Sequence, residues 1–161
     1  MIQLKSKREL EKMREAGRHV GEILQRLGEL AKPGVTTAEL DRVAHEEIRA
    51  RKLESSFLGY APGDNPPFPA VICASVNEEI VHGIPGGRRL VEGDLLKIDF
   101  GAICDGFHAD AAITVPIGEV DEESRRLVST TLSSLYAGVE QMAPGKRLGD
   151  VGAAVQETVE R

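Results

Sequence analysis

The strongest chemical signal in this sequence is a pair of aspartates, Asp99 and Asp110, on either side of the dipeptide Asp105-Gly106. Two neighbouring carboxylates repel each other unless a cation or a shared proton neutralises them. Carboxylate oxygens are good ligands for divalent cations. If the fold brings these two side chains together, they form a candidate site for a divalent metal ion.

A β-hairpin would bring the two aspartates together. Asp105-Gly106 is typical of a two-residue turn in which both residues have positive φ. Counting outward from this turn pairs Gly101 with Asp110, and side-chain alternation then places both aspartates on one face. As diagonal neighbours, their Cβ atoms would lie roughly 7 Å apart or less. Gly101, opposite Asp110, would leave room for an ion or a substrate.

The other face of this hairpin is wholly apolar and is expected to pack on a core; it carries Leu96, Ile98, Phe100, Ala102, Ala109, Ala111, Ile113 and Val115. The arrangement depends on the loop length. A three-residue loop would put the aspartates on opposite faces. Two solvated aspartates on an open polar face are the alternative to a metal site.

Histidines supply further candidates for chemistry. His82 follows a strand-like run, in the loop Val81–Pro85. A lone loop histidine is more often a surface residue than a functional one. His108 shares the aspartate face and would serve as a ligand or as the hydrogen-bond partner of a ligand. His19 and His45 fall within predicted helices, and we interpret both as structural or solvated.

The composition indicates a soluble cytosolic protein with one domain. The chain has 161 residues and is 41% hydrophobic, enough to build a core. Its net charge of −6 argues against a nucleic-acid surface. No apolar run approaches the roughly 20 residues of a membrane span, and the charged N-terminus is unlike a secretory signal. Cys73 and Cys104 form no CxxC pair, so nothing indicates an oxidising compartment.

Two helical hairpins are expected, because apolar residues recur at steps of three and four residues near both ends of the chain. The first covers residues 6–52 and the second covers residues 121–161. Each is interrupted by a Pro-Gly pair, at Pro33-Gly34 and at Pro144-Gly145. Capping boxes are expected at the first two helix starts, at Ser6–Glu9 and Thr36–Glu39.

The repeated order of helix, Pro-Gly and helix suggests an internal repeat. Strands are expected over residues 57–115, with one at 70–76 and the aspartate hairpin at 94–115. After the second helical hairpin the chain stops at Arg161, where the matching strands would begin. We therefore expect about one and a half units of a two-unit fold. A complete domain with two generic helical hairpins is the alternative.

Three segments, Ser75–Pro85, Leu96–Gly101 and Asp105–Asp110, carry a resemblance to the type I methionine aminopeptidases of peptidase family M24. Ser75–Pro85 resembles the segment that bears the family's active-site histidine. Leu96–Gly101 resembles the strand with the first metal ligand, and Asp105–Asp110 the strand with the second. The order and spacing match from the first helix to the end. The resemblance implies an α+β pita-bread (creatinase/aminopeptidase-like) fold with a pseudo-twofold repeat, in which residues 1–161 are the N-terminal part of a single catalytic domain.

The resemblance also implies a reaction. Such enzymes remove the initiator methionine from nascent proteins when the second residue is small. They use two divalent cations (Co, Mn, Fe or Zn), and a bridging water attacks the scissile carbonyl. Asp99 and Asp110 would be metal ligands, and His82 would be catalytic, bonding to the scissile amide. The family's methionine pocket would be formed by His82 with Phe57, Tyr60, Phe68 and Cys73, for which ordinary core packing is the alternative.

The sequence departs from the family pattern in two places. The loop at 61–68 is longer than in the commonest bacterial pattern. The family's remaining histidine and its two glutamate ligands have no match before Arg161, so we expect little activity from this chain alone. A non-catalytic peptide-binding module of the same superfamily is the alternative. A prolidase-like hydrolase is a third possibility, against which the context of His82 argues.

The resemblance further implies a cytoplasmic protein that is monomeric when complete. Its partner would be the N-terminal methionine of nascent peptides, with a transient association with the ribosome. Direct binding of nucleic acid or of a membrane is not expected.

Overall fold

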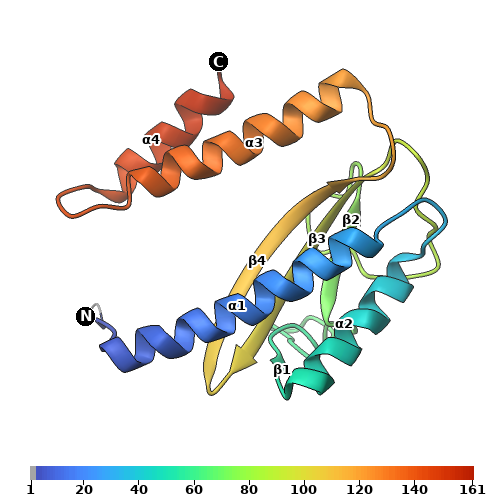
Figure 1. The fold of residues 1–161 in the computed structure, drawn as a ribbon, viewed down its shortest axis with the longest axis horizontal. Helices are drawn as coiled ribbons and strands as arrows, with labels where there is room; N and C mark the ends of the chain where they lie inside the picture. The colour runs from blue at the N-terminus through green and yellow to red at the C-terminus, as the bar shows by residue number, and fades with distance from the viewer. Residues whose placement is uncertain (1–2) are drawn as a thin grey trace. The chain divides into compact units, whose positions relative to one another are not determined.

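The computed structural model describes residues 3–161, which form two compact units (Figure 1). The first unit ends at Glu119, and the second is Val120–Arg161. The elements of the first unit are α1 (Lys7–Leu30), α2 (Thr37–Arg51), β1 (Glu54–Ser55), β2 (Ile72–Val76), β3 (Leu95–Cys104) and β4 (Phe107–Pro116). The second unit contains α3 (Glu122–Glu140) and α4 (Leu148–Val159). No helix among the described residues has the length and apolar character needed to span a membrane.

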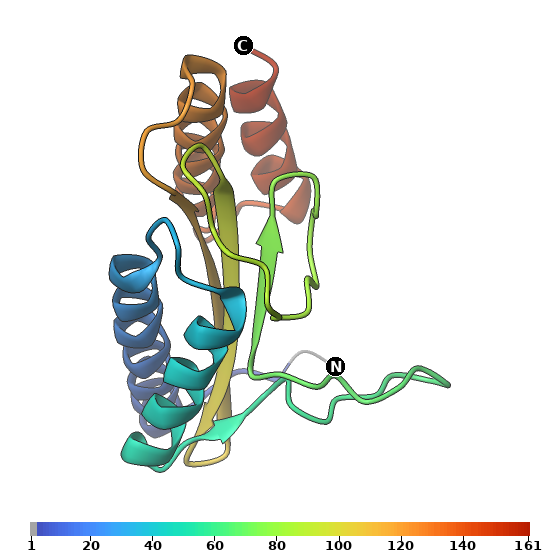
Figure 2. The same ribbon diagram turned by 90° about the vertical axis from the view of Figure 1, so that its right-hand side faces the viewer.

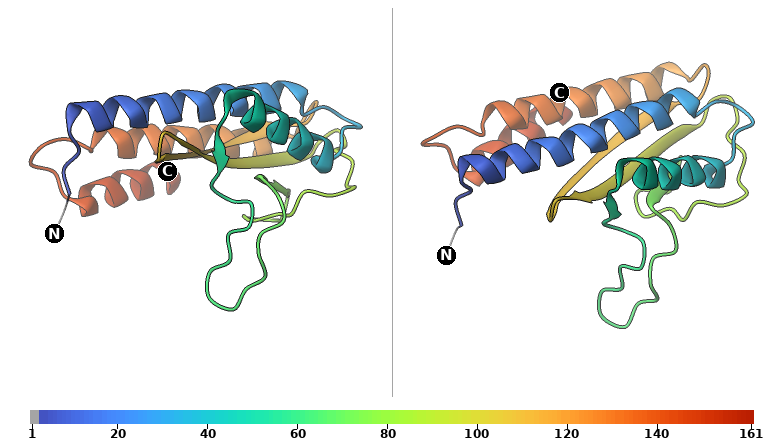
Figure 3. Two further views of the ribbon diagram at one scale, coloured as in Figure 1. Left: turned by 90° about the horizontal axis from the view of Figure 1, so that it is seen from below. Right: turned by 60° about the horizontal axis from the view of Figure 1, so that its bottom comes forward.

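The sheet of the first unit is built around β3. All of its pairings are antiparallel, with β1 and β2 along one edge of β3 and β4 along the other. Helices α1 and α2 cover one face of this sheet, as Figure 2 shows. The segment that joins β1 to β2 projects on the opposite side (Figure 3). The sheet therefore has one face packed on helices and one face free to carry polar chemistry.

The core lies between α1, α2 and the sheet. Its largest buried side chains include Ile23 and Leu27 of α1, Leu40 of α2, and Ile98 and Phe100 of β3. The apolar stripe expected in the first helix is confirmed in part: Val20, Leu24, Leu27 and Ala31 are buried, whereas Leu10, Met13 and Gly17 are exposed. Both expected capping boxes are formed, from Ser6 and Thr36. Burying such a stripe is what stabilises a surface helix in a globular protein.

The apolar face of the β3–β4 hairpin packs as expected, with one exception. Leu96, Ile98, Phe100 and Ala102 are buried, and Ala109, Ile113 and Val115 pack against the core. The expectation for Ala111 was wrong, because this residue is exposed. It lies on the edge strand β4, and its single methyl group is not among those that contact the core.

The second unit is a pair of helices joined by a short turn. Asp121 caps the start of α3 by accepting a hydrogen bond from the Ser124 amide. Gly138 lets α4 approach closely, since a Cβ there would lie 2.9 Å from a methyl carbon of Val155. Gly145 of the Pro-Gly pair turns the chain with a φ of +88°. The predicted order of helix, Pro-Gly and helix is thus present in both units.

The start of β2 and the presence of β1 differ from the sequence prediction. The strand predicted at 70–76 begins at Ile72, and the amides of Val71 and Ile72 at its start donate to Asp41 Oδ1 of α2, at 2.9 and 3.2 Å. Strand β1 was not predicted. It has two residues, too few to show any alternation of polar and apolar side chains.

Candidate metal centre

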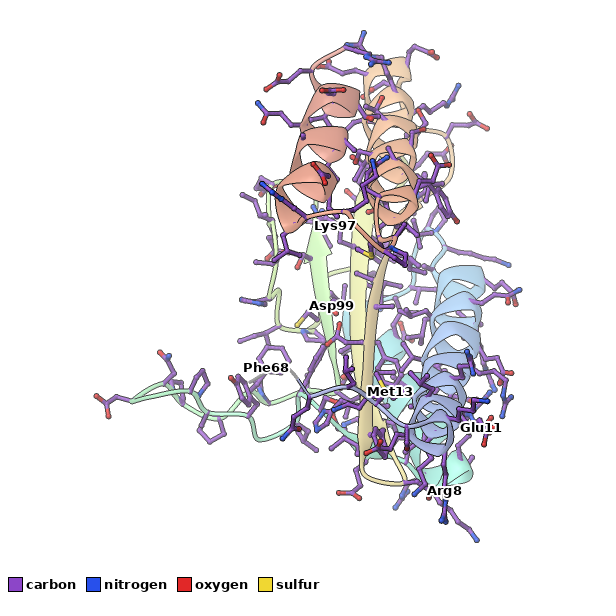
Figure 4. The ribbon with its side chains drawn as sticks, turned by 90° about the vertical axis from the view of Figure 1, so that its left-hand side faces the viewer. Arg8, Glu11, Met13, Phe68, Lys97 and Asp99 are labelled. Atoms are coloured by element: carbon purple, nitrogen blue, oxygen red, sulfur yellow. The ribbon has the colours of Figure 1, made fainter. Side chains whose placement is uncertain are left out.

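The predicted register of the aspartate hairpin is confirmed. Gly101 pairs with Asp110 and Asp99 pairs with Ala112. The loop has two residues, Asp105 with a φ of +49° and Gly106 with a φ of +80°. Both aspartates therefore lie on the face of the sheet that α1 does not cover, and Figure 4 labels Asp99 there on β3.

The two carboxylates are close enough to change each other's ionisation. Burial raises the pKa of Asp99, and so do the negative charge of Asp110 and a hydrogen bond that the two carboxyl groups form when one is protonated. The nearby His82 and the backbone amide of Phe100 act in the opposite direction on that pKa. The pair therefore resists holding two negative charges by itself.

One oxygen of this pair lacks a partner. Among the described residues, Asp99 Oδ1 is the buried side-chain oxygen or nitrogen without a hydrogen-bond partner. Buried polar atoms are nearly always satisfied, so an orphaned carboxylate oxygen next to a second carboxylate needs an explanation. A divalent cation would satisfy the oxygen and neutralise the repulsion together. The donor set thus fits a hard or intermediate metal ion.

Gly101 is required here by crowding rather than by conformation. A Cβ on this residue would lie 2.8 Å from Cε1 of Phe57 and 3.0 Å from Oδ2 of Asp110. The expectation that the glycine leaves open room for an ion is therefore wrong in detail. The space over Gly101 is used by the Phe57 ring and by the carboxylate of Asp110, which both approach the strand closely.

His82 lies in the loop after β2 and is exposed. Its charge reaches Asp99, whose pKa it lowers. Its φ is +61°, a left-handed conformation that residues other than glycine rarely adopt. The structure thus brings the predicted catalytic histidine into the neighbourhood of the aspartate pair.

The predicted pocket residues are only partly assembled. The rings of Phe57 and Phe68 meet edge to face, with centroids 6.5 Å apart. Cys73 is buried on β2 directly opposite Asp99 in the ladder. Burial, and then the charges of Asp99 and Asp110, raise the pKa of the Cys73 thiol to about 11, so it stays neutral. Tyr60 is 63% exposed, on the projecting loop.

His108 is the other histidine on this face. It is exposed, and its Nδ1 lies 3.0 Å from Oγ of Ser56. The amide of Ser56 in turn donates to the carbonyl of Gly101. These contacts fasten the segment that carries Phe57 to the hairpin. They do not bring the His108 ring and the aspartates into one ligand set.

The site has no third ligand within the part of the chain that the structure describes. No group of three or more His, Cys, Asp or Glu side chains among residues 3–161 is arranged to hold a metal ion. A pair of carboxylates binds divalent metals weakly, since affinity grows with the number and geometry of ligands. By themselves, Asp99 and Asp110 would therefore be an incomplete set of metal ligands.

Two residues that shape this region had no sequence signal strong enough to single them out. Asp41 of α2 holds the start of β2 through the amides of Val71 and Ile72. Ser75 of β2 is 2% exposed and accepts a hydrogen bond from the amide of Gly83. A polar residue inside the apolar run Ile72–Val76 was the available hint for Ser75.

Comparison with known proteins assigns the family. The model of metallopeptidase family M24 matches residues 11–161. The chain belongs to this family. It is 47% identical over 161 residues to a methionine aminopeptidase of Clostridium acetobutylicum, covering 99% of this chain and 62% of that protein. The expected resemblance to the methionine aminopeptidases is confirmed.

Solved structures agree with this assignment. A methionine aminopeptidase from Rickettsia prowazekii superposes with a TM-score of 0.93 at 34% identity, over 99% of this chain and 62% of that one. A prolidase from Pyrococcus furiosus shares the fold alone, with a TM-score of 0.81 at 18% identity. The α+β pita-bread fold is therefore confirmed. The chain spans about 62% of the length of the first relatives it matches.

Proposed function

We propose that this chain forms part of a metal-dependent methionine aminopeptidase, which removes the initiator methionine from nascent proteins when the second residue is small. The observation that carries the proposal is the aspartate pair, with its orphaned Asp99 Oδ1, in a chain that belongs to a metallopeptidase family. The relatives named methionine aminopeptidase support the choice of substrate.

The residues of this chain take distinct parts in the proposal. Asp99 and Asp110 hold one or two divalent cations, of Co, Mn, Fe or Zn. When bound, such cations activate water and polarise the scissile carbonyl. His82 donates a hydrogen bond at the scissile amide and orients the substrate.

The pocket for the methionine side chain is formed by His82 with Phe57, Tyr60, Phe68 and Cys73. Aromatic rings and a neutral thiol suit a flexible, polarizable thioether. The edge-to-face contact of Phe57 and Phe68 supports this assignment. We propose a cytoplasmic location, a monomeric whole protein and transient contact with the ribosome, all from the resemblance to methionine aminopeptidases.

A complete site needs more ligands than these residues provide. The family pattern adds a histidine and two glutamates, and no third ligand joins the aspartates among residues 3–161. We therefore propose that residues outside these 161 complete the centre and the single catalytic domain. The chain alone should release methionine from a Met-Ala-Ser peptide negligibly.

The same observation keeps one other function open. A peptide-binding module that has lost its metal site would also lack a third ligand. In such a module no cation would offset the repulsion between the two carboxylates or satisfy the buried oxygen of Asp99, so the aspartate pair favours the metal-dependent function. Metal binding by the chain itself separates the two functions.

The test joins residues 1–161 to the remaining C-terminal part of the Clostridium acetobutylicum relative and measures methionine release with added Mn²⁺ or Co²⁺. We expect turnover by this fusion, and a loss of at least about a hundredfold in kcat/KM for Asp99→Asn or Asp110→Asn. Asp105→Asn is the matched control, since asparagine tolerates the left-handed φ of the turn. Mn²⁺ binding by residues 1–161, followed by electron paramagnetic resonance, gives a second reading. Binding that Asp99→Asn leaves intact would contradict the proposal.

A further inference from the structure

The backbone of His82 is held in a conformation it would not choose by itself. Its φ of +61° lies in the left-handed region, where the side chain of any residue but glycine is crowded. Such residues persist only where surrounding contacts fix them, and they gather at functional sites. The contacts that hold His82 therefore matter for where its imidazole lies.

The residue after His82 is pressed onto β2. The amide of Gly83 donates to Ser75 Oγ at 3.0 Å, and the amide of Ala74 donates to the Gly83 carbonyl at 2.9 Å. A Cβ on Gly83 would lie 2.5 Å from the carbonyl oxygen of Ala74. Gly83 is thus docked on the strand so closely that no side chain fits, and this docking fixes one end of the His82 loop.

The other end of the same loop is fixed to β3. Asn77, with a φ of +53°, donates its backbone amide to the Leu95 carbonyl at 3.0 Å. Its side chain bonds the Leu95 amide and the Asp94 carboxylate, each at 2.8 Å. The segment from Asn77 to His82 is therefore fixed at both ends, and Ser75 supplies the side-chain contact at the His82 end.

Ser75 is well placed to connect this loop with the aspartate pair. In the β2–β3 ladder Ser75 lies opposite Lys97 and Cys73 lies opposite Asp99, so all four side chains share the face of the sheet that α1 does not cover. Figure 4 labels both Lys97 and Asp99, which belong to β3. Ser75 is 2% exposed, because the Gly83 segment covers it.

We infer that Ser75 is a positioning residue, whose buried hydroxyl holds Gly83 and thereby fixes the strained backbone and the imidazole of His82 beside Asp99. The bearing of this role on peptide hydrolysis rests on the function proposed above for His82. The positioning itself can be measured without turnover.

A second buried hydroxyl in the chain provides a matched control. Thr37 of α2 is also 2% exposed, and its Oγ1 accepts a hydrogen bond from the amide of Gly86 at 2.9 Å. It bonds a glycine of the same loop region, but beyond His82. A variant at Thr37 removes the same kind of contact without altering the hydrogen bond between the Gly83 amide and Ser75 Oγ.

The experiment records nuclear magnetic resonance spectra of the isotope-labelled 161-residue chain. It measures the ³J(HN,Hα) coupling and the ¹³Cα shift of His82, the ring shifts of its imidazole, and the exchange rate of the Gly83 amide. Ser75→Ala, Ser75→Cys and Thr37→Val are compared with the unaltered chain under conditions where each is folded. Cysteine has the same branching as serine, with a somewhat larger sulfur atom, and replaces the hydroxyl by a weaker acceptor.

We expect Ser75→Ala to move His82 out of the left-handed region and shift its ring resonances, with Gly83 exchange faster by at least about tenfold. Ser75→Cys should give a smaller change in the same direction, and it decides the question if Ser75→Ala does not fold. Thr37→Val should leave His82 unchanged. An unchanged His82 in the Ser75 variants, or an equal change in Thr37→Val, overturns the inference. Failure of the fusion protein to release methionine contradicts the proposed function without affecting this result.

Discussion

At the scale of single residues, the aspartate pair combines a cost in stability with a chemical use. Asp99 is half-buried, and burial and the nearby Asp110 raise the pKa of its carboxyl group. A group whose pKa is raised by folding stabilises the fold only while it is protonated. In the metal-free chain the ionised form of Asp99 therefore opposes folding, and this cost appears as the pH rises through the folded pKa of Asp99. This conflict between stability and charge is typical of functional sites.

Gly101 offers a prediction at this scale. Gly101→Ala should destabilise the chain by about 1–3 kcal/mol, because its Cβ would overlap the Phe57 ring and crowd Asp110. Urea unfolding followed by circular dichroism measures the change. Gly87→Ala is the control, as a Cβ there meets nothing within 4 Å. Equal stability of the two variants would show that Phe57 does not pack against the strand.

At the scale of elements, the β3–β4 hairpin was predictable because its register depends on local chemistry. Asp105-Gly106 fixes a two-residue turn, and alternation then sets every pair in the ladder. The left-handed backbone of His82 and the docking of Gly83 on β2 were not predictable. They arise from contacts between segments whose closeness only the folded chain creates.

Asp94, directly before β3, accepts a hydrogen bond from Asn77, directly after β2. Its ionisation leads to a prediction about how stability depends on pH. Burial alone would raise the pKa of Asp94, but hydrogen bonds from the Val91 amide and the Asn77 side chain, with the charge of Arg88, bring it below its ordinary value. A lowered pKa gives stability that is present above the unfolded value of about 3.9 and is lost as the pH falls through the folded value.

Asp94→Asn should therefore lower stability at pH 7 and make the midpoint of urea unfolding less dependent on pH below about pH 4. Arg88 is half exposed, at 49% of its side chain, so Arg88→Gln should cost less than Asp94→Asn. Denaturation series from pH 2.5 to pH 7 would check both. A midpoint whose pH dependence is the same in Asp94→Asn and the unaltered chain would count against this role of Asp94.

At the scale of the whole chain, the two units differ in how much they bury. The first has a continuous core from α1 and α2 to β2 and β3. In the second, α4 has no buried residue, and apolar side chains of α3 such as Leu127, Leu135 and Tyr136 are exposed. The repeated helical pattern was visible in the sequence. The difference in burial was not, because both helical pairs carry similar apolar stripes.

Hydrogen exchange should resolve this difference. Regions with few buried contacts open locally at lower free energy than the core. We expect the amides of α4 to exchange at least about a hundredfold faster than those of β3 in the 161-residue chain. Helix α1, which buries Ile23 and Leu27, is the helical control and should exchange slowly. Comparable protection of α4 and β3 would contradict this description of the second unit.

The central claim is that Asp99 and Asp110 form a metal site, and the stability of Asp99→Asn with and without Mn²⁺ tests it most directly. In the unaltered chain, Mn²⁺ at ten times its dissociation constant should add about 1.4 kcal/mol to the free energy of unfolding. Without metal at pH 7, Asp99→Asn should be more stable than the unaltered chain, and Mn²⁺ should not stabilise it further, while Asp105→Asn should behave like the unaltered chain. An Asp99→Asn variant that is less stable without metal, yet gains as much from Mn²⁺ as the unaltered chain, would contradict the account.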